Sequence, residues 1–488
     1  MLTVSVIPTS RRLAAADLLN ASHHCDVIEL CLDHLIKEPD VGKLAHTVET
    51  PMIISCRTPE EGGAFSGSSA ERVQMLKLAI VAEPMYVELD TSIASSIPRY
   101  GKTKRVVSVR GSRWSSEEWQ SAYLEAANQD ADYVKLVTEA HTLEEAWPLL
   151  KLLTGKQTVP IIPVVEGAAS LMFSLLTKKY GSPWTYAALE PGRESFPGQP
   201  SVWDLRDVYQ IQEINSKTRF MGMVGFGDIQ NRVARTLNRA YAAHDHHLCC
   251  LPFLIGQDHS HLEKLLNALK IHALLIGSEM AVAMSGFANE LDESAQQSKY
   301  CDLLIQHEGQ WKGYNFIWRS VLRGLEDVLQ QDEQDPRPLN RRNVIVVGAT
   351  GMAQAVAFGV QRRKGILSLS SPKEQEGQRL AEMFDCRHVP FHAIYETLAD
   401  VIILADAEVS SGAGRQELNP SFFRPNMVVL DLTNMPELSL LGKGAEEHQS
   451  KIVPCDGIFF DLIRAWYKAT TGDRLEQDEV RELWKQDE

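Results

Sequence analysis

The sequence has few cysteines and a shortage of positive charge. Its 488 residues include eight cysteines, which form no Cys-x-x-Cys pair and show no metal-ligand spacing. Scattered cysteines are typical of a reducing compartment, so we expect a cytoplasmic protein without disulfides or a metal site. Lys and Arg total 49 against 64 Asp and Glu, a formal net charge of −15 at pH 7. This balance argues against partners that present phosphate backbones or anionic lipid, so we expect no nucleic acid and no membrane as partner.

Long hydrophobic runs are also absent. No segment of about 18 uninterrupted apolar residues occurs, and the N-terminus MLTVSVIPTSRRL lacks the pattern of a secretory signal. The chain nevertheless is 44% hydrophobic and 23% charged, a composition typical of packed globular domains. At roughly 150 residues per domain, it predicts about two to four domains with their own cores.

The first 190 residues alternate short Val- and Ile-rich runs with segments of helical period. The eight runs are LTVSVIP, CDVIELCLD, PMIISCR, MYVELD, KRVVSVRG, YVKLVT, VPIIPVVEG and WTYAALE. Eight buried strands, each followed by a helix, predict an α/β fold of the (β/α)₈ barrel type, with a doubly wound open sheet as the alternative. The Gly- and Pro-rich segment 191–200 breaks this pattern, which predicts a first domain at 1–215.

The rest of the chain predicts two further α/β units. In residues 216–332, the runs RFMGMVGF, HLCCLPFLI, HALLIG and CDLLIQ alternate with helical segments, as in a small α/β domain. The polar stretch QQDEQDPRPLNRRN at 330–343 predicts a linker. After it, NVIVVGATGMAQAVAFGV indicates a strand, a glycine turn and a helix, so residues 333–488 are predicted to form a Rossmann-like nucleotide-binding domain with C-terminal helices.

One predicted barrel strand carries a lysine among apolar neighbours. Lys135 lies between Val134 and Leu136. Burial disfavours an ammonium and lowers its pKa, which would make Lys135 a nucleophilic amine. The alternative is a lysine paired with a barrel carboxylate such as Glu29. The residues alone leave both interpretations open.

Four motifs in the predicted barrel resemble the type I 3-dehydroquinate dehydratases over residues 1–205. They are IELCLD, CRTPEEGG, ADYVKLV and SFPGQ, in this order. In that family a barrel lysine forms an imine with the C3 ketone of 3-dehydroquinate, and a histidine removes a C2 proton and returns a proton to the departing hydroxyl. The resemblance implies Lys135 as the imine lysine, Glu29 and Arg57 as substrate contacts, Glu61 as the residue that orients the base, and Ser195 and Gln199 on a lid loop over the substrate.

The family's catalytic histidine is missing from this sequence. Its position on the fifth strand, in Val107-Ser108-Val109-Arg110, holds Arg110, and an arginine cannot take up a proton near neutral pH. Arg110 therefore remains a candidate catalytic residue with an altered role. His141 is the nearest substitute base in the sequence, although a structural role is the simpler interpretation. Two cationic contacts of the family are replaced by Cys31 and Ser174.

The order of the domains resembles proteins in which this dehydratase is fused to a shikimate dehydrogenase. Over residues 219–472, Asn231 is the remaining hydrogen-bonding side chain in the turn that the family uses for the substrate carboxylate. The family's catalytic lysine aligns at or near Ala281, its paired aspartate with Ile317, and two further polar contacts with Cys301 and near Leu462. We therefore expect the dehydrogenase half to be impaired.

The glycine turn after residue 347 keeps part of a dinucleotide-binding pattern. Gly348, Thr350 and Gly351 would place backbone amides at a helix N-terminus against a pyrophosphate. NADP is therefore a candidate cofactor for the C-terminal half, whereas the barrel chemistry needs none. In the alternative, Gly348 and Gly351 only let the helix pack on the strand.

The resemblance implies a protein of the shikimate pathway, and so of aromatic amino acid biosynthesis. Its barrel would dehydrate 3-dehydroquinate to 3-dehydroshikimate through a lysine imine. One alternative is a catalytically degenerate homologue that binds a metabolite or regulates a partner. Another carbonyl reaction on the same lysine also stays open. The expected partner is a small molecule, and a homodimer is an open alternative.

Overall fold

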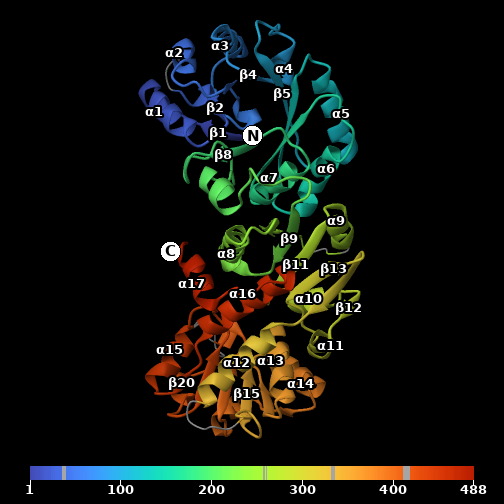
Figure 1. Ribbon diagram of the computed structural model, residues 1–488, viewed down its shortest axis with the longest axis vertical. Coiled ribbons are helices and arrows are strands. Elements are labelled where there is room, and N and C mark those ends of the chain that lie inside the picture. The colour runs from blue at the N-terminus through green and yellow to red at the C-terminus, as the bar shows by residue number, and fades with distance from the viewer. Residues whose placement is uncertain (36–39, 257–258, 260, 331–335, 410–417, 488) are drawn as a thin grey trace. The chain divides into compact units, whose positions relative to one another are not determined.

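The computed structural model describes most of the chain (Figure 1). The described residues are 1–35, 40–256, 259, 261–330, 336–409 and 418–487. Contacts divide the chain into two compact units, Met1–Arg219 with His247–Leu269, and Phe220–His246 with Lys270–Glu488. Residues 331–335 of the predicted linker lie outside the described residues.

The first unit contains a sheet of eight parallel strands. They are β1 (Leu2–Val6), β2 (Val27–Cys31), β3 (Met52–Ser55), β4 (Tyr86–Asp90), β5 (Lys104–Arg110), β6 (Tyr133–Glu139), β7 (Ile161–Glu166) and β8 (Thr185–Ala188). Their order in the sheet is β7-β6-β5-β4-β3-β2-β1-β8. From β1 to β7, consecutive strands thus lie side by side, and β8 returns to pair with β1.

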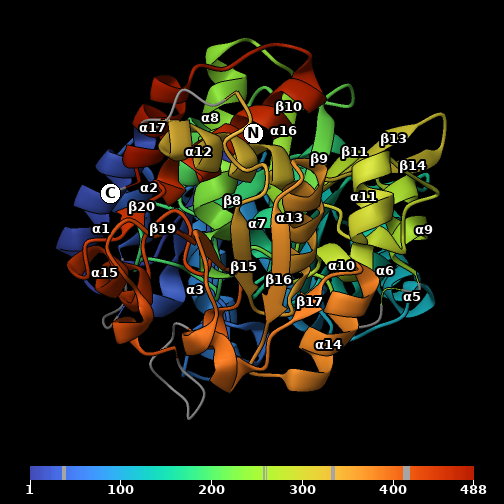
Figure 2. The same ribbon diagram turned by 90° about the horizontal axis from the view of Figure 1, so that it is seen from below.

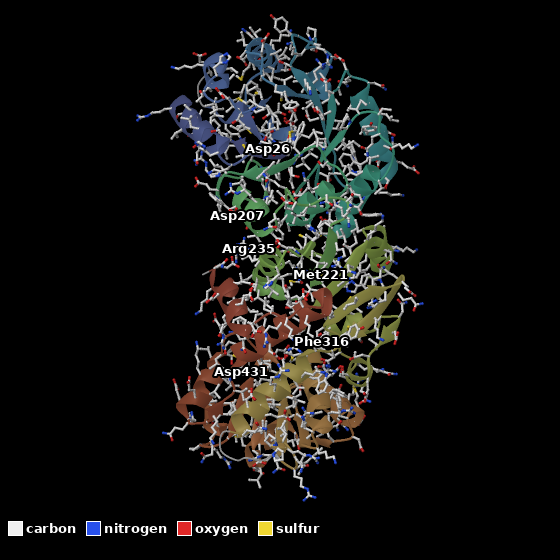
Figure 3. All side chains as sticks on the ribbon, viewed as in Figure 1. Asp26, Asp207, Met221, Arg235, Phe316 and Asp431 are labelled. Atoms are coloured by element: carbon white, nitrogen blue, oxygen red, sulfur yellow. The ribbon has the colours of Figure 1, made fainter. Side chains whose placement is uncertain are left out.

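Side chains from both ends of this sheet meet in one core. The buried cluster includes Val27 of β2, Tyr86 of β4, Ile162 of β7 and Tyr186 of β8. Strands at opposite ends of a sheet share an interior only when the sheet curls round on itself, so the eight strands form a nearly closed barrel. The predicted (β/α)₈ barrel is confirmed, and the doubly wound alternative is wrong. At the base, the Asp26 carboxylate (Figure 3) accepts the Leu2 N–H at 2.7 Å and ties β1 to the start of β2.

Helices follow most of the barrel strands, and side chains near their ends cap them. They are α1 (Arg11–Ser22), α2 (Val41–Ala45), α3 (Ser69–Val81), α4 (Thr91–Ala94), α5 (Ser116–Ala127), α6 (Leu143–Leu153) and α7 (Ser170–Lys179). Capping boxes begin α3 at Ser68 and α5 at Ser115. The short turn after β3 is also a capping box, from Thr58 to Glu61, and it fixes the Glu61 side chain near the carboxyl end of β3.

Residues 247–269 group with the barrel by their contacts. They include β10 (Leu248–Pro252) and α9 (Leu262–Ala268). The Leu143 N–H donates to the Leu254 carbonyl at 2.8 Å, and the Gly256 N–H donates to the Glu144 carboxylate at 3.1 Å. These bonds join the segment to the beginning of α6.

The second unit begins with a mixed sheet. Its strands are β9 (Arg219–Val224), β11 (Ile271–Ile276), β13 (Leu303–His307), β14 (Gln310–Tyr314) and β12 (Glu290–Leu291), neighbours in this order. Strand β13 runs antiparallel to both β11 and β14. The helices of this part are α8 (Gln230–Ala243), α10 (Ala281–Ser285), α11 (Glu293–Ser298) and α12 (Ile317–Gln330).

The C-terminal part of the second unit is built on a parallel sheet (Figure 2). Its strands are β15 (Asn343–Val347), β16 (Ile366–Ser370), β17 (Arg387–His388), β18 (Val401–Leu404), β19 (Val428–Asp431) and β20 (Lys451–Ile452). The order β17-β16-β15-β18-β19-β20 reverses direction at β15, as in a Rossmann-like fold. The predicted nucleotide-binding fold is therefore confirmed. Its helices are α13 (Gly351–Arg362), α14 (Glu374–Met383), α15 (Leu440–Glu447), α16 (Cys455–Thr471) and α17 (Gln477–Lys485).

Buried polar groups organise the loops of this sheet. Asp431, labelled in Figure 3, ends β19 and accepts the Ser439 N–H at 2.8 Å just before α15. Strand β15 is an uninterrupted apolar run from Val344 to Val347, because a central parallel strand is covered on both faces. None of the described helices is long and apolar enough to cross a membrane.

Candidate active site

A layer of polar side chains lies inside the barrel where apolar side chains would normally pack. Glu29 on β2, Glu88 on β4, Lys135 on β6 and Tyr186 on β8 come from alternate strands, which is how one layer of a (β/α)₈ barrel is assembled. The Lys135 Nζ donates to Glu88 Oε2 at 2.8 Å and lies 3.5 Å from Glu29 Oε1. It also lies 4.4 Å from the centre of the Tyr186 ring. Lys135 is only 2% exposed, so these groups replace its water.

The charges of this layer offset one another. Burial alone would lower the pKa of Lys135, but the attraction of Glu88, Tyr186 and Glu29 outweighs burial and raises the pKa above its ordinary value. The expected lowered pKa of Lys135 is therefore wrong, because two carboxylates face the ammonium. Burial likewise disfavours the charged form of Glu29, yet Lys135 and Arg57 lower the pKa of that carboxyl to about 2. The layer therefore holds a lysine cation against two carboxylates, the pairing that the alternative interpretation predicted.

Arg57 follows β3 and enters the same layer from the side. Its Nη2 lies 3.9 Å from Glu29 Oε2 and donates to the Cys31 Sγ at 3.3 Å. Its backbone N–H donates to Asp33 Oδ1 at 3.2 Å, which holds the chain as it leaves the strand. The buried Nε of Arg57 has no hydrogen-bond partner among the described residues. An unpaired buried donor next to a lysine is a candidate contact for an oxygen of a ligand.

The loop after β8 covers this layer and is joined to it by hydrogen bonds. Gln199 Oε1 accepts the Ser195 N–H at 2.7 Å, and Gln199 Nε2 donates to the Ser5 Oγ at 3.1 Å. Ser5 in turn donates to Glu29 Oε2 at 2.7 Å. The chain of bonds thus runs from the loop to a carboxylate beside Lys135. The Ser195 Oγ is buried and, in the part of the chain that the structure describes, unpaired.

A glycine lets this loop approach the end of β7. Gly198 has a φ of +74°, and a Cβ on it would lie 2.1 Å from the Gly167 carbonyl oxygen. The Gly167 N–H donates to the Pro197 carbonyl at 2.7 Å. Any side chain at position 198 would therefore lift the loop from the barrel.

Two arginine–glutamate pairs lie nearer the mouth. Glu61 accepts from Arg72, with Nη1 to Oε1 at 2.6 Å and a second contact from Nη2 to Oε2. Burial raises the pKa of the Glu61 carboxyl, against the lowering by Arg72. Arg110 binds both oxygens of Glu166, with Nη1 to Oε1 at 2.8 Å and Nη2 to Oε2 closer still. Its Nη1 also lies 3.4 Å from the Glu61 carbonyl oxygen, so the arginine spans the mouth from β3 to β7.

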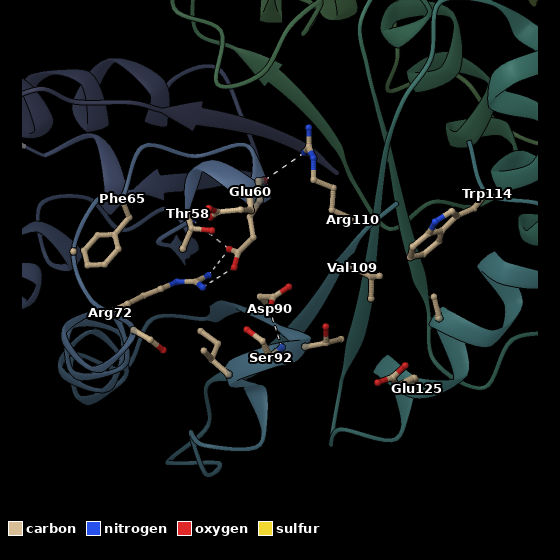
Figure 4. A pocket seen from close by; sticks show the side chains of 16 residues that line it. Thr58, Glu60, Phe65, Arg72, Asp90, Ser92, Val109, Arg110, Trp114 and Glu125 are labelled. Carbon is tan, nitrogen blue, oxygen red and sulfur yellow. Dashed lines mark hydrogen bonds and ion pairs between the residues drawn. The ribbon is translucent and has the colours of Figure 1, made fainter. Parts of the chain in front are cut away.

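Two cavities of very different size meet at this arginine. The inner space holds only about 10 Å³, no more than one water molecule, and Lys135, Glu88, Glu166 and Phe196 are among its walls. The outer cavity holds about 580 Å³ (Figure 4). Both cavities are lined by Glu61, Asp90, Val109 and Arg110. The space beside Lys135 is therefore much smaller than the space at the mouth.

A family comparison covers the barrel. Residues 2–216 match the model of the type I 3-dehydroquinases. The barrel is a type I 3-dehydroquinase domain. The match ends next to the predicted boundary at residue 215 and leaves the second unit outside it.

Relatives with names from the same pathway match beyond the 3-dehydroquinase barrel. The chain is 25% identical over 380 residues to the chloroplastic bifunctional 3-dehydroquinate dehydratase/shikimate dehydrogenase of Arabidopsis thaliana, which covers 73% of this chain and 62% of that protein. It is 23% identical over 474 residues to the shikimate biosynthesis protein AroDE of Chlamydia pneumoniae, covering 93% of this chain and 91% of that protein. The solved dehydroquinate dehydratase and shikimate dehydrogenase of S. pombe AroM shares 18% identity, with a TM-score of 0.43, over 99% of this chain and 98% of that one.

Some curated relatives are much longer than this chain. The matched region covers 22% of the pentafunctional AROM polypeptides of Candida glabrata and Candida tropicalis. Together with the 62% for the Arabidopsis protein, the chain thus spans less than two thirds of several proteins that it matches.

The 3-dehydroquinase barrel brings most of the expected residues together. Lys135, Glu29 and Arg57 share one layer, and Gln199 reaches it through Ser5. Glu61 and Arg110 lie farther out and bind other partners instead of each other's side chains. His141 does not lie in this layer: its side chain is 61% exposed and lies 3.3 Å from Glu139.

Sequence reasoning missed Glu88, the nearest partner of Lys135. It also gave no role to Glu166, the last residue of β7. A usable signal was present, because inward-facing positions alternate along each strand and a polar residue at such a position needs a partner. Glu88 stands two residues before the end of β4, between the apolar residues Val87 and Leu89, just as Lys135 stands between apolar neighbours on β6.

The corresponding positions in the second unit are buried and carry no charge. Ala281, Cys301 and Ile317 are fully buried, and Leu462 is nearly so. Asn231 is exposed on α8. Among all the described residues, no group of three or more His, Cys, Asp and Glu side chains could hold a metal ion.

The glycine turn before α13 is explained well by packing. Gly348 has a φ of +124°, and a Cβ there would lie 2.5 Å from the Asp406 Cβ. A Cβ on Gly351 would lie 2.7 Å from a methyl group of Val282. Thr350 begins α13: its hydroxyl donates to the Ala405 carbonyl at 2.6 Å and accepts the Ala353 N–H at 3.4 Å. Each residue of the predicted cofactor turn thus has a structural role.

Proposed function

We propose that the barrel dehydrates 3-dehydroquinate to 3-dehydroshikimate through an imine on Lys135. The observation that carries the proposal is the buried layer in which Lys135 contacts two carboxylates beneath a loop joined to it by hydrogen bonds. Burying three charged side chains costs stability unless they pair well, and such clusters are concentrated at functional sites. The membership of the domain in the type I 3-dehydroquinase family supports this activity.

The first chemical step needs Lys135 as a neutral amine. The Glu88 carboxylate, 2.8 Å from Nζ, is placed to accept the proton. The amine then attacks the C3 ketone, and loss of water gives the imine. Removal of a C2 proton gives an enamine, which expels the C1 hydroxyl. Hydrolysis of the resulting conjugated imine releases the enone product and returns Lys135 to the free amine.

Unpaired polar atoms near Lys135 would hold the substrate. The Arg57 Nε is a buried donor, and the Ser195 Oγ is a buried hydroxyl on the covering loop. A carboxylate or hydroxyl of the substrate would satisfy both, which offsets the cost of burying them. Contacts with the bound substrate would also replace the contacts that the side chains around the inner space now make with one another.

Imine trapping tests the proposal directly. Borohydride added to the protein with 3-dehydroquinate is expected to attach one ligand mass to Lys135, located by peptide mass spectrometry. Lys135→Ala should lose both the label and the formation of the conjugated enone. Lys151→Ala, which changes an exposed lysine on α6, is the matched control and should keep both. Turnover that survives in Lys135→Ala would overturn the proposal, and labelling without turnover would favour a metabolite-binding protein.

We infer that the second unit is impaired as a shikimate dehydrogenase. The support is that Ala281 and Ile317, at the positions of the family's lysine and aspartate, are buried side chains that cannot transfer a proton. The backbone N–H groups at the start of α13 would hold the pyrophosphate of NADP, and NADP bound there would supply a hydride acceptor or donor. Lys373 is the cation nearest in sequence to the end of β16, and it would meet the additional phosphate of NADP. Its exposed pair with Glu408 at 2.8 Å can open at little cost.

Two measurements separate cofactor binding from reduction. Fluorescence titration with NADP reports binding, and absorbance of the reduced nicotinamide with shikimate reports turnover. We expect no turnover, whether or not NADP binds. Saturable binding with sustained turnover would overturn the inference.

A further inference from the structure

We propose that Glu166, held by Arg110, is the group that moves protons to and from the substrate in the barrel. This inference rests on the proposed dehydration through Lys135. The resemblance to the family places Arg110 where a catalytic histidine is expected, and an arginine cannot serve as a base near neutral pH. The structure shows what that arginine does instead: it binds both carboxylate oxygens of Glu166.

Glu166 lies at the right place for this role. It is the last residue of β7, the strand next to β6, and its side chain is 6% exposed. Lys135 pairs in register with Ile162, so Glu166 lies two inward-facing positions nearer the mouth on the neighbouring strand. Both side chains line the inner space of about 10 Å³. Glu166 therefore faces the same space as Lys135 from the side of the mouth, where a ring bonded to Lys135 would extend.

Arg110 orients this carboxylate and leaves other acceptor sites on its oxygens open. A bidentate arginine occupies one lone pair on each oxygen, and a carboxylate has about four acceptor sites. Its guanidinium charge also offsets the cost of burying Glu166. Arg110 is itself anchored on the opposite side by the Glu61 carbonyl at 3.4 Å, so it acts as a positioning residue.

The other acidic groups that line the inner space are held by groups other than Arg110. Glu88 contacts Lys135 and accepts its proton, while both oxygens of Glu61 bind Arg72. Asp90 begins α4, and its Oδ1 accepts the Ser92 N–H at 2.8 Å. Glu166 is thus the carboxylate that lines the inner space and is held by a residue at the position of the missing base.

The proposed proton transfers balance. The Glu166 carboxylate takes a proton from C2 of the imine, and the electrons of that C–H bond form the enamine. The enamine then expels the C1 hydroxyl, which takes the proton back from Glu166 and leaves as water. Glu166 begins and ends the cycle as a carboxylate, and no oxidant or reductant is needed.

Exchange of the C2 proton tests this role separately from imine formation. Each protein is incubated in D₂O with 3-dehydroquinate, and deuterium at C2 of recovered substrate is followed by NMR, beside enone formation and borohydride trapping. Glu166→Gln should lower exchange and turnover about 10²–10⁴-fold, the usual contribution of a positioned base. It should keep the borohydride label on Lys135.

Three comparisons keep the test decisive. Glu139→Gln changes an exposed carboxylate that pairs in register with Glu166, and it should leave exchange unchanged. Glu166→Asp keeps a carboxylate and should retain more exchange than Glu166→Gln at the same melting temperature. Exchange in Glu166→Gln within about fivefold of the unmodified protein, with the label present, would overturn the role of Glu166 and leave the imine intact.

Failure of the proposed function would look different. If the unmodified protein gives no label on Lys135, then the imine itself is wrong and the role of Glu166 falls with it. If the label forms but the unmodified protein neither exchanges the C2 proton nor turns over, the imine stands and Glu166 is not a base.

Discussion

In the barrel, Lys135 and Glu29 are buried as charges, whereas in the second unit Ala281, Cys301 and Ile317 are buried without charge. These two sets of positions are the ones that the two family resemblances assign to chemistry. The barrel keeps charges in a place where each must be paired. The second unit has apolar or small side chains there, which carry no charge that must be paired. Buried charge at these positions therefore distinguishes the barrel from the second unit.

Two buried carboxyl groups show how much the partner matters. Burial raises the pKa of Asp302 in the second unit to about 7. Its partners are the backbone N–H groups of Phe316 and Ile317, both at 2.8 Å, and the Trp466 indole. Glu29 in the barrel is equally buried, yet Lys135 and Arg57 lower its pKa to about 2. Hydrogen bonds without a full positive charge do not offset desolvation, whereas two cations do.

The largest expected effect comes from removing the cation of the barrel layer. Lys135→Met leaves Glu29 and Glu88 buried without their main partner, so it should destabilise the barrel by about 3–5 kcal/mol. Hydrogen exchange of β6 peptides in the full chain measures this. The double variant Lys135→Met with Glu88→Gln should recover part of the loss. A single variant as stable as the unmodified protein would mean that the layer is not held by its charges.

The stability of the second unit should fall when buried side-chain volume is removed, whereas that of the barrel should fall when a buried charge is removed. Ile317→Ala empties a fully buried position at the start of α12 and should cost about 2–5 kcal/mol. Exchange of α12 peptides reports the loss, and β6 peptides serve as the internal control. Little change in α12 would indicate that position 317 is not part of a packed core.

The two units should also depend on pH in opposite directions. Glu29 has a folded pKa of about 2, below its ordinary value of 4.5, so its stabilisation is present above pH 4.5 and is lost as the pH falls toward 2. Asp302 has a folded pKa of about 7, above its ordinary 3.8, so its contribution is complete below pH 3.8 and is lost as the pH rises through 7.

From pH 4.5 to 8, the second unit should therefore lose about 3 kcal/mol that the barrel does not lose. Urea unfolding followed by exchange of α12 and β6 peptides at both pH values measures the difference. Asp302→Asn keeps an acceptor for the backbone N–H groups and should remove most of the pH dependence of α12. An unchanged dependence in this variant would assign it to other groups.

The smallest effect is expected at the exposed pair after β16. Lys373→Gln breaks the contact with Glu408, and because both side chains are largely exposed it should change stability by about 1 kcal/mol or less. The same variant should weaken NADP binding in the fluorescence titration if Lys373 meets the cofactor's additional phosphate. A binding curve identical to that of the unmodified protein would remove Lys373 from the proposed site.

Much of the fold could be predicted because local patterns carry it. All eight barrel strands were recognised from apolar runs separated by helical segments, and parallel strands buried on both faces leave that pattern in the sequence. The Rossmann-like sheet was recognised in the same way. Short edge strands such as β17 and β20 were missed, since two residues leave no periodicity to detect.

The candidate site was predicted in part. The motifs identified Lys135, Glu29, Arg57 and Gln199, which the structure places in or next to one layer. The direction of the Lys135 pKa shift was wrong, because it depends on how many carboxylates face the amine. The pairing of Arg110 with Glu166 was also invisible, because residues 56 positions apart meet only when the barrel closes.

By itself the sequence determined which segments become strands and helices, that the first of them close into a barrel, and which side chains are present for chemistry, because these follow from short-range patterns of polarity and from motifs. The tertiary structure alone decided the electrostatics. Whether Lys135 is a free amine or a paired ammonium, and whether Arg110 replaces a base or holds one, depends on charges a few ångströms away that belong to distant strands. Coulomb interactions act through space in a buried, weakly screened interior, and only the folded barrel sets those distances.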